Sequence, residues 1–315
     1  MRRSCLFLLV FSLFGVSSFG NELRKTAMSP LDLGEITAEG WLKNQLRIQA
    51  DGLSGHLDEF WPDIKDSAWF GGDREGWERA PYWLDGVIPL AYTLDDAALK
   101  EKVHRYVNII VENQHEDGWL GPKTDRMEDF DLWSHFLVWK MLAQYQKATG
   151  DEKVKAAMLK DIRRVSKHID KAPLREWAKS RWFEGFIGTY QLYEQTRQEW
   201  LLETAAKLGK QGTDWCGFWA TTPITKATPK GKWNHMGHVV NNAMALKSGA
   251  LWWRMSGRDV DRRAVYDMME KLDRYHGMVT GVFTGDECLA GKDPTQGTEL
   301  CSVVEYMFSL EVLLS

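Results

Sequence analysis

The end of the chain gathers five side chains that could donate a proton, attack carbon or bind a metal: Asp286, Glu287, Cys288, Glu299 and Cys301. Asp286 and Glu287 are adjacent, in a loop rich in glycine. Their mutual repulsion favours a raised pKa on one of them, which is the property that a general acid needs near neutral pH. Exposed loop carboxylates without a catalytic role are the alternative, because such residues are common on protein surfaces.

Glu299 and Cys301 are predicted to lie together at the start of a helix. Apolar residues recur with helical spacing after Gly297, and Thr298 occupies the position of an N-cap. Helix amides would lower the pKa of a thiol in the first turn, and the thiolate is the form that binds metal. A carboxylate and a thiolate two residues apart fit half of a zinc site. A Cys288–Cys301 disulfide is the alternative in an oxidising compartment.

Two histidines occupy matched positions in the pattern of predicted helices. His135 and His238 each stand at the beginning of the first helix of a helical pair. Asp85 holds a similar place in an earlier pair, and Glu184 does so less clearly. If the pairs form a ring, equivalent helix ends point into one cleft, so these side chains would meet there. A lone histidine is more often structural, and it is the matching of the two that indicates a cleft.

The elements that must position these residues are helical hairpins. Apolar periodicity interrupted by short polar turns predicts them at 81–92 with 97–114, 131–148 with 152–170, 176–195 with 199–211, and 238–255 with 260–275. Repeated hairpins stack side by side and bury one another's apolar faces. Strand signals are few, so the sequence predicts an all-α domain.

Helical hairpins can build either an open superhelix or a closed α/α toroid. The long segments 118–129, 217–236 and 277–297 favour the toroid, because loops gathered at one end of a ring build a cleft. A further helix is predicted at 38–49, and 56–77 is expected to be a long functional loop, since it mixes glycine with tryptophan and aspartate.

Residues 1–20 have the pattern of a secretory signal peptide, with a charged start, an apolar core and small residues before the cleavage site. The apolar stretch is too short for a stable membrane span. We therefore expect a periplasmic or secreted protein, with a flexible lead-in at 21–30 and one domain at 31–315. Few cysteines remain after cleavage, so the fold must depend on its core rather than on a disulfide framework.

Composition narrows the class of partner. The net charge is −4 and no basic patch stands out, which argues against nucleic acid. The chain has 16 tryptophans, whose flat rings can stack on the C–H face of a sugar. Packing of a large helical core is the alternative use of such bulky residues. Trp61 and Trp77, which stand beside charged residues, are the better candidates for a cleft.

Four stretches of the sequence carry a resemblance to a known family: GDECLAGKDPTQGTELC, WERAPYWLDG, DLWSHFLVWKMLAQYQKATGD and GHVVNNAMALK. With them the chain resembles the glycoside hydrolase family of bacterial β-L-arabinofuranosidases over residues 30–315. The resemblance implies a six-hairpin α/α toroid followed by β-sandwich domains. It also implies retaining hydrolysis of L-arabinofuranoside-type or related glycans, in which a zinc-held cysteine thiolate attacks and a glutamate protonates the leaving oxygen.

The same resemblance assigns roles to residues of this chain and makes zinc the implied cofactor and an oligosaccharide or polysaccharide the implied partner. The expected site residues are Glu287 as acid/base catalyst, Glu299 and Cys301 as zinc ligands, and His135, His238, Asp85 and Trp83 around the sugar.

One departure from the family pattern affects the chemistry. The family's nucleophile and last zinc ligand come from a Cys-Cys pair downstream of the Glu-x-Cys motif, and the given chain ends at Ser315. We therefore expect a toroid that is incomplete at its C-terminus, with the nucleophile cysteine beyond it. Whether the chain alone is an enzyme stays open, and a non-catalytic carbohydrate-binding or scaffold protein on the same toroid is the alternative.

Overall fold

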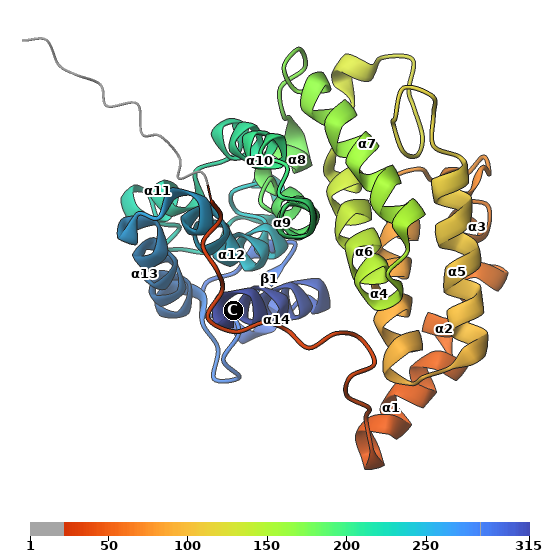
Figure 1. Ribbon diagram of the computed structural model, residues 1–315. Coiled ribbons are helices and arrows are strands. Elements are labelled where there is room, and N and C mark those ends of the chain that lie inside the picture. The colour runs from red at the N-terminus through yellow and green to blue at the C-terminus, as the bar shows by residue number, and fades with distance from the viewer. Residues whose placement is uncertain (1–21, 284) are drawn as a thin grey trace, which may run out of the picture.

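A computed structural model describes residues 22–283 and 285–315, which fold mainly into helices (Figure 1). The first helices are α1 (Gly40–Asp51), α2 (Leu53–Phe60) and α3 (Pro62–Lys65). The hairpins that follow are α4 (Arg79–Thr93) with α5 (Ala97–Glu112), α6 (Trp133–Thr149) with α7 (Glu152–His168), α9 (Glu184–Thr196) with α10 (Trp200–Gln211), and α12 (Val239–Ser256) with α13 (Asp259–His276). The remaining helices are α8 (Glu176–Ser180), α11 (Trp215–Thr221) and α14 (Leu300–Leu314).

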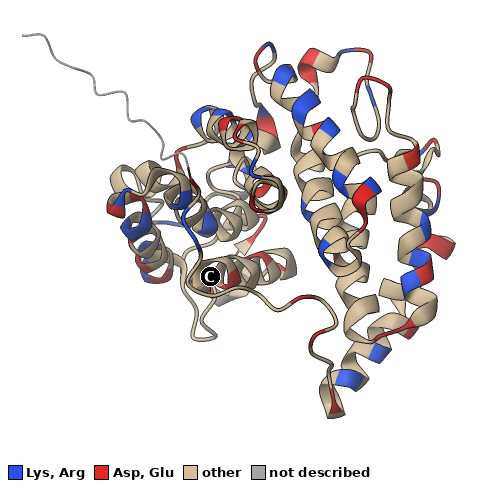
Figure 2. Ribbon diagram, in the orientation of Figure 1, with Lys and Arg blue, Asp and Glu red and all other residues tan. Residues whose placement is uncertain are grey.

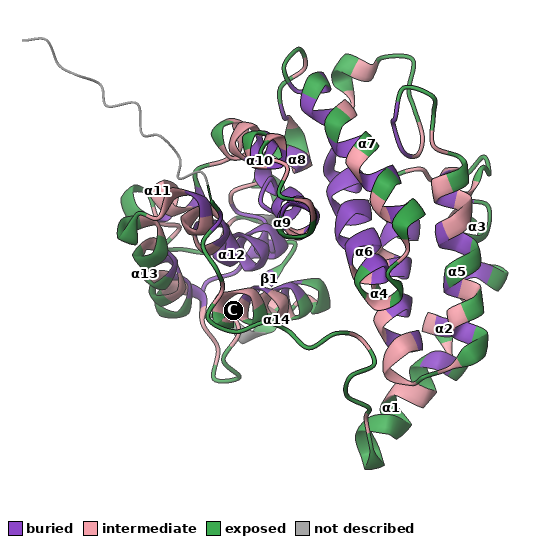
Figure 3. Ribbon diagram, viewed as in Figure 1, coloured by how far each residue is buried: buried purple, intermediate pink, exposed green. Residues whose placement is uncertain are grey.

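The hairpins are arranged with one helix inside and one outside. The inner helix α6 packs between α4 and α9, and α12 packs against α14. Figure 3 shows α6 and α12 mostly buried, because apolar residues surround them on every side. The outer helix α7 buries only a stripe of its residues, as expected for a helix with one face in water. This is the α/α toroid that the sequence predicts.

The turns between paired helices follow from local chemistry. Gly150 ends α6 with a φ of 69°, a left-handed conformation that costs glycine nothing. Asp151 then caps α7 by accepting hydrogen bonds from the Lys153 and Val154 amides. Such a cap stabilises a helix by about 1 kcal/mol. These turn residues explain why the predicted hairpin boundaries agree closely with the observed ones.

Three sequence-based predictions are wrong in detail. The helix predicted at 176–195 is broken at 181–183 into α8 and α9. The segment 56–77, expected to be a loop, contains most of α2 and all of α3. The lead-in at 21–30 was predicted to be flexible, yet Leu23 is buried and the Arg24 amide donates to the Arg254 carbonyl at 2.9 Å. The predicted signal peptide at 1–20 lies outside the described residues.

Among the described residues the two strands are very short, β1 (Gly285–Asp286) and β2 (Cys288–Leu289), paired antiparallel with Asp286 opposite Cys288. Isolated bridges add to them, one of which joins His238 to Cys288. The hairpin is joined to the start of α12, since the Val239 amide donates to the Glu287 carbonyl at 3.0 Å. Among the described helices, none combines the length and the apolar character needed to cross a membrane.

Candidate active site

Glu287 forms the tip of the β1–β2 hairpin. With Asp286 opposite Cys288, it is the single residue that connects the two strands. Its φ is 64°, a conformation that non-glycine residues adopt at a cost of about 1 kcal/mol or more. The side chain is 64% exposed. A strained, exposed carboxylate held by a tight hairpin is typical of a functional site.

His238 is the side chain that faces Glu287. It is the N-cap of α12, where its Nδ1 accepts a hydrogen bond from the Asn241 amide at 3.1 Å. Its Nε2 lies 3.3 Å from Oε2 of Glu287. Burial, followed by the nearby charge of Arg181, lowers the pKa of His238 to about 3. The ring is therefore neutral near pH 7, and because Nδ1 accepts, the proton is on Nε2, the nitrogen that lies 3.3 Å from the Glu287 carboxylate.

Glu299 supports the same hairpin from the other side. Its Oε2 accepts a hydrogen bond from the Glu287 amide at 3.1 Å. Burial raises the pKa of Glu299, and the negative charges of Glu287 and Asp286 add to the effect. Glu299 is itself the N-cap residue of α14, one position later than the Thr298 cap predicted from the sequence.

Cys301 lies two residues after Glu299 at the start of α14, and the interaction of its thiol with that carboxylate favours the ionised form of Glu299. The prediction of a lowered thiol pKa is wrong. Although the residue is exposed overall, partial desolvation of its thiol raises the pKa, and the carboxylates of Glu299, Glu305 and Glu78 raise it further. Within the described residues Cys288 and Cys301 are both free thiols, so no disulfide joins them. Cys288 is buried in β2, whereas Cys301 is exposed.

Two of the ligands of the predicted zinc site lie in this chain. A carboxylate and a thiolate are groups that Zn²⁺ accepts, and Glu299 and Cys301 are in contact. Over residues 22–283 and 285–315, however, no three His, Cys, Asp or Glu side chains come together as a metal site. A structural zinc site usually has four ligands. The described residues therefore fit one side of a metal cage and not a whole one.

A buried arginine, Arg181, packs against the aromatic rings next to His238. Arg181 lies in the break between α8 and α9, and its Nε donates to Asn241 Oδ1 at 2.7 Å. Its guanidinium is 4.4 Å from the ring centroid of Trp133 and 4.3 Å from that of Trp177. Glu78 Oε2 accepts from Trp133 Nε1 at 2.6 Å, with Arg181 Nη1 3.9 Å away. Two rings and two polar partners fix this cation in place.

Aromatic rings continue from Trp177 towards His238. The Trp177 centroid is 5.5 Å from Trp233, 4.9 Å from His235 and 5.2 Å from His238. Trp233 is 38% exposed, so part of its ring is open to solvent. Nε2 of His235 is buried without a hydrogen-bond partner. An apolar ring surface with an unused polar atom beside it, close to Glu287, suits the C–H and O–H groups of a sugar.

We call the region of Glu287, His238 and Trp233 the mouth of the toroid. Below it, charged side chains form a network inside the ring of helices. Lys247 Nζ lies 2.5 Å from Glu184 and 3.5 Å from Glu305, and Tyr82 Oη donates to Glu305 at 3.5 Å. Desolvation raises the pKa of Glu184. For Glu305 desolvation is again the largest single cause, but the combined attraction of Lys247, Lys140 and Arg181 outweighs it and lowers the pKa. The network connects α9, α12, α14 and α4, and so closes the ring of inner helices around the site.

The structure brings together four of the predicted site residues, namely Glu287, His238, Glu299 and Cys301. Asp85 instead forms a buried ion pair with Lys140 at 2.9 Å, so its carboxylate is occupied inside the toroid. Trp83 is buried, and its Nε1 donates to the Ser54 carbonyl at 2.8 Å. These contacts leave neither side chain free to line a sugar site.

His135 is also placed apart from the mouth. It is fully buried, its Nδ1 lies 3.0 Å from Asp161 Oδ2, and Trp69 and Trp119 pack against the ring. The two matched histidines therefore have different surroundings in this structure. His135 Nε2 is buried without a hydrogen-bond partner, and its contact with a sugar stays a prediction.

Sequence reasoning missed Arg181, His235, Trp177 and Glu305, and it named Glu78 only as part of a charged stretch beside Trp77. The run Trp233-Asn234-His235-Met236-Gly237-His238 contained a usable signal, since it places two histidines and a tryptophan just before a helix. Nothing in the sequence marked Arg181, because its role depends on a break between two helices.

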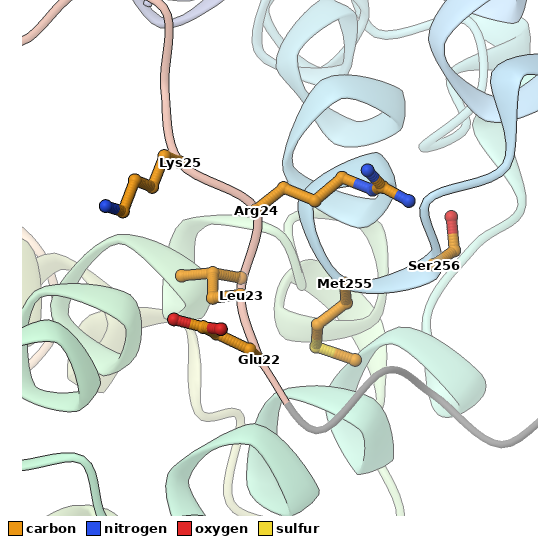
Figure 4. A pocket seen from close by; sticks show the side chains of 6 residues that line it. All are labelled: Glu22, Leu23, Arg24, Lys25, Met255 and Ser256. Carbon is orange, nitrogen blue, oxygen red and sulfur yellow. The ribbon is translucent and has the colours of Figure 1, made fainter.

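Two cavities lie away from this cluster. One, of about 420 Å³, forms where the N-terminal segment meets the end of α12, with Leu23 and Met255 among its lining residues (Figure 4). The other, of about 500 Å³, lies between α5 and α7. Neither cavity is lined by a residue predicted to belong to the active site.

Fold and site together define a toroid of helical hairpins with a carboxylate, a histidine and aromatic rings at its mouth, an arrangement suited to carbohydrate. The chain belongs to the family described as β-L-arabinofuranosidase, GH127 catalytic domain, whose model matches residues 24–315. No curated protein sequence matches the chain significantly.

Solved structures share the fold at low sequence identity. A GH127 β-L-arabinofuranosidase from Geobacillus stearothermophilus T6 superimposes with a TM-score of 0.60 at 16% identity, covering 88% of this chain and 52% of the other. A protein described as a glycoside hydrolase gives 0.62 at 15% identity, with 89% and 47% coverage. A GH127 β-arabinofuranosidase gives 0.61 at 15% identity, with 90% and 51% coverage. The chain spans about half the length of these proteins.

Proposed function

We propose that the domain hydrolyses glycosidic bonds of L-arabinofuranosides or related glycans, with Glu287 as the general acid and base. The observation that carries the proposal is the hairpin tip, where an exposed carboxylate in a strained conformation faces a neutral histidine at 3.3 Å. Family membership supports the reaction class. The side chain of Glu287 projects far enough from the protein to reach a leaving-group oxygen.

The surrounding residues would each have a definite task. Nε2 of His238 lies 3.3 Å from one carboxylate oxygen of Glu287, close enough to restrict where that carboxylate lies. Glu299 holds the backbone of the same residue through its amide. Trp233 and Trp177 offer ring surface to a sugar, and His235 offers an unused nitrogen. These contacts position the substrate and the proton donor relative to each other, which is worth several orders of magnitude in rate.

We further propose that Glu299 and Cys301 supply two zinc ligands. Bound zinc would convert the Cys301 thiol to a thiolate and order the start of α14. The described residues hold only one side of such a site, so no catalytic step is derived through the metal. The retaining mechanism with a zinc-held cysteine nucleophile remains part of this proposal. Zinc content of the purified chain, compared between wild type and Cys301→Ser, tests the ligand assignment.

Glu287→Gln tests the catalytic proposal. The variant removes the transferable proton and keeps the size of the side chain, so turnover of an arabinofuranoside with a poor leaving group should fall by about 100-fold or more. Asp286→Asn is the matched control, because it neutralises the neighbouring carboxylate in the same hairpin, and it should keep activity within a few fold. Equal activity of Glu287→Gln and wild type would exclude Glu287 as the acid.

A non-catalytic carbohydrate-binding role is the second candidate. It is favoured by the state of the other thiols in the described chain, since Cys216 and Cys288 lie buried or half-buried away from solvent. Burial raises the pKa of Cys216 to about 11, which makes it a poor nucleophile. Binding of an arabinofuranoside by the full chain without any hydrolysis would support this role and contradict the catalytic one.

Export from the cytoplasm is proposed from residues 1–20 alone. A mature N-terminus at or near Asn21, measured by mass spectrometry of the protein recovered from the periplasm or medium, is the expected result. Recovery of the protein with Met1 retained would contradict it.

A further inference from the structure

The cavity of about 500 Å³ between α5 and α7 is lined by an excess of positive charge. Acidic groups on its lining are Glu116 and Asp117, in the turn that follows α5, whereas α7 contributes Lys160, Arg163, Arg164 and Lys167. Spacings of three and four residues place these cations on one face of the helix. Figure 2 shows blue bands recurring along α7. The sequence alone gave no basic patch, because the cations are separated by apolar core residues and are gathered only by the helix.

Of the two acidic side chains on the lining, Asp117 is already neutralised, whereas Glu116 has no ion pair among the described residues. Asp117 accepts from Arg164 at 3.0 Å and from Lys123 at 3.1 Å. Desolvation opposes its ionisation, but hydrogen bonds from Arg164, the Trp119 amide and Lys123 outweigh this and lower its pKa to about 2. Arg164 and Asp117 therefore satisfy each other, and neither Lys160, Arg163 nor Lys167 has an ion pair with a carboxylate anywhere in the described chain.

The cations without a carboxylate partner form an extended row. Arg163 is held in place by Trp200, whose ring centroid is 3.8 Å from the guanidinium. Lys160 and Lys167 are exposed on either side of it, and the row spans about 10 Å along the helix axis. One small anion cannot reach all three groups. A polymer with regularly spaced negative charges can pair with each of them and relieve their mutual repulsion.

The groove lies near the end of the toroid at which the inner helices α6 and α12 begin. Asp161 of α7 contacts His135 at the start of α6, so the segment Lys160–Lys167 is beside the inner-helix ends. The start of α12, with His238 and Glu287, is the equivalent end of another hairpin. A long substrate could therefore be held at the outer wall of the toroid while a branch of it enters the mouth.

We propose that this groove is a secondary binding site for an acidic polysaccharide, whose carboxylate groups pair with Lys160, Arg163 and Lys167. The identity of the polymer as a glycan rests on the proposed function, whereas the polyanion site rests on the groove itself. Nucleic acid is a poorer fit because the exposed row offers no aromatic ring for base stacking, as Trp200 is covered by Arg163.

The test measures the affinity of the full chain for sodium polygalacturonate, a polyuronate, at about 20 mM and about 200 mM salt. The triple variant Lys160→Gln, Arg163→Gln, Lys167→Gln is expected to lose about tenfold or more of the low-salt affinity, and wild-type binding is expected to weaken at the higher salt. The matched control is Arg262→Gln, Arg263→Gln, Arg274→Gln, which removes the same charge from α13, where each arginine has an acidic partner. Its affinity should stay within about twofold of wild type.

Several outcomes would overturn the proposal. These are an absence of polygalacturonate binding at low salt, equal losses in the two triple variants, binding of monomeric galacturonate as tightly as of the polymer, or equal affinity for duplex DNA. Hydrolysis and binding of a neutral arabinofuranoside should be unchanged in the groove variant. This measurement separates the proposed polysaccharide groove from the proposed hydrolase function. Loss of polymer binding with normal arabinofuranoside turnover identifies the groove as a site of its own.

Discussion

His238 and His135 stand at the same end of two inner helices, α12 and α6, and their surroundings differ completely. Beside His238 the chain places a strained hairpin, an exposed carboxylate and half-open tryptophan rings. Beside His135 it places Asp161 and closely packed rings, and the imidazole is fully buried. Both histidines are buried, at 4% exposure for His238 and 0% for His135. The helical repeat therefore determines the level at which a side chain lies in the toroid, whereas the segment that covers the helix end determines whether its neighbours are exposed groups or packed rings.

The difference suggests separate tasks for the two ends. The α6 end is a packed joint between hairpins, since Asp161 accepts hydrogen bonds from the Leu120 amide at 2.8 Å and from Trp139 Nε1 at 2.7 Å. The α12 end is an open mouth. Replacement of each histidine should therefore affect a different measurable property.

His135→Ala should produce the largest loss of stability. The substitution removes a buried ring from between Trp69 and Trp119 and takes one partner from Asp161, so the free energy of unfolding should fall by about 2 to 4 kcal/mol. Denaturant unfolding measures this, with His56→Ala on the exposed surface of α2 as control, expected to cost less than about 0.5 kcal/mol. Reduced sugar affinity in the folded protein, with normal stability, would show instead that His135 touches the substrate.

His238→Asn should act mainly on catalysis, with an effect somewhat smaller than that of Glu287→Gln. Asparagine is a good N-cap and can replace the bond to the Asn241 amide, but it is too short to reach Glu287. Turnover should fall by about 30- to 100-fold, equivalent to about 2 to 3 kcal/mol, while the free energy of unfolding changes by about 1 kcal/mol or less. Full activity in this variant would mean that the contact with Glu287 does not matter. His238→Ala, which also removes the cap, should be the less stable of the two.

These two positions also show how far the sequence could lead. Gly150, Asp151 and the apolar spacing are local signals, and the hairpins predicted from them are confirmed. The Glu287 loop and the closeness of Glu299 to Cys301 could be predicted because these residues are close in sequence, but the β-hairpin within that loop was not predicted. The burial of His135 depends on Trp69 and Trp119 from other segments, and Arg181 depends on a helix break. Such long-range contacts leave no periodic trace in the chain.

The pH dependence of stability gives a smaller effect of known sign. Because the pKa of His238 is about 3 when folded and about 6.5 when unfolded, the unfolded state binds more protons between these values. The contribution of the neutral ring to stability is present above about pH 6.5 and is lost as the pH falls towards 3. Between pH 6.5 and 5 the wild type should lose about 1 to 2 kcal/mol more than His238→Asn. Parallel curves for the two proteins would place the pKa of His238 near its ordinary value.

The smallest expected effect isolates the strain at the hairpin tip. Glu287→Gly and Glu287→Ala both remove the carboxylate and its contact with His238, and they differ only in how easily they adopt the φ of 64°. Glycine accepts that conformation without steric cost, so its variant should be the more stable by about 1 kcal/mol, even though glycine loses more backbone entropy on folding. Thermal unfolding of the two variants side by side measures the difference. If alanine is equally stable, the hairpin tip is not strained, and the contrast between the open end of α12 and the packed end of α6 depends on burial alone.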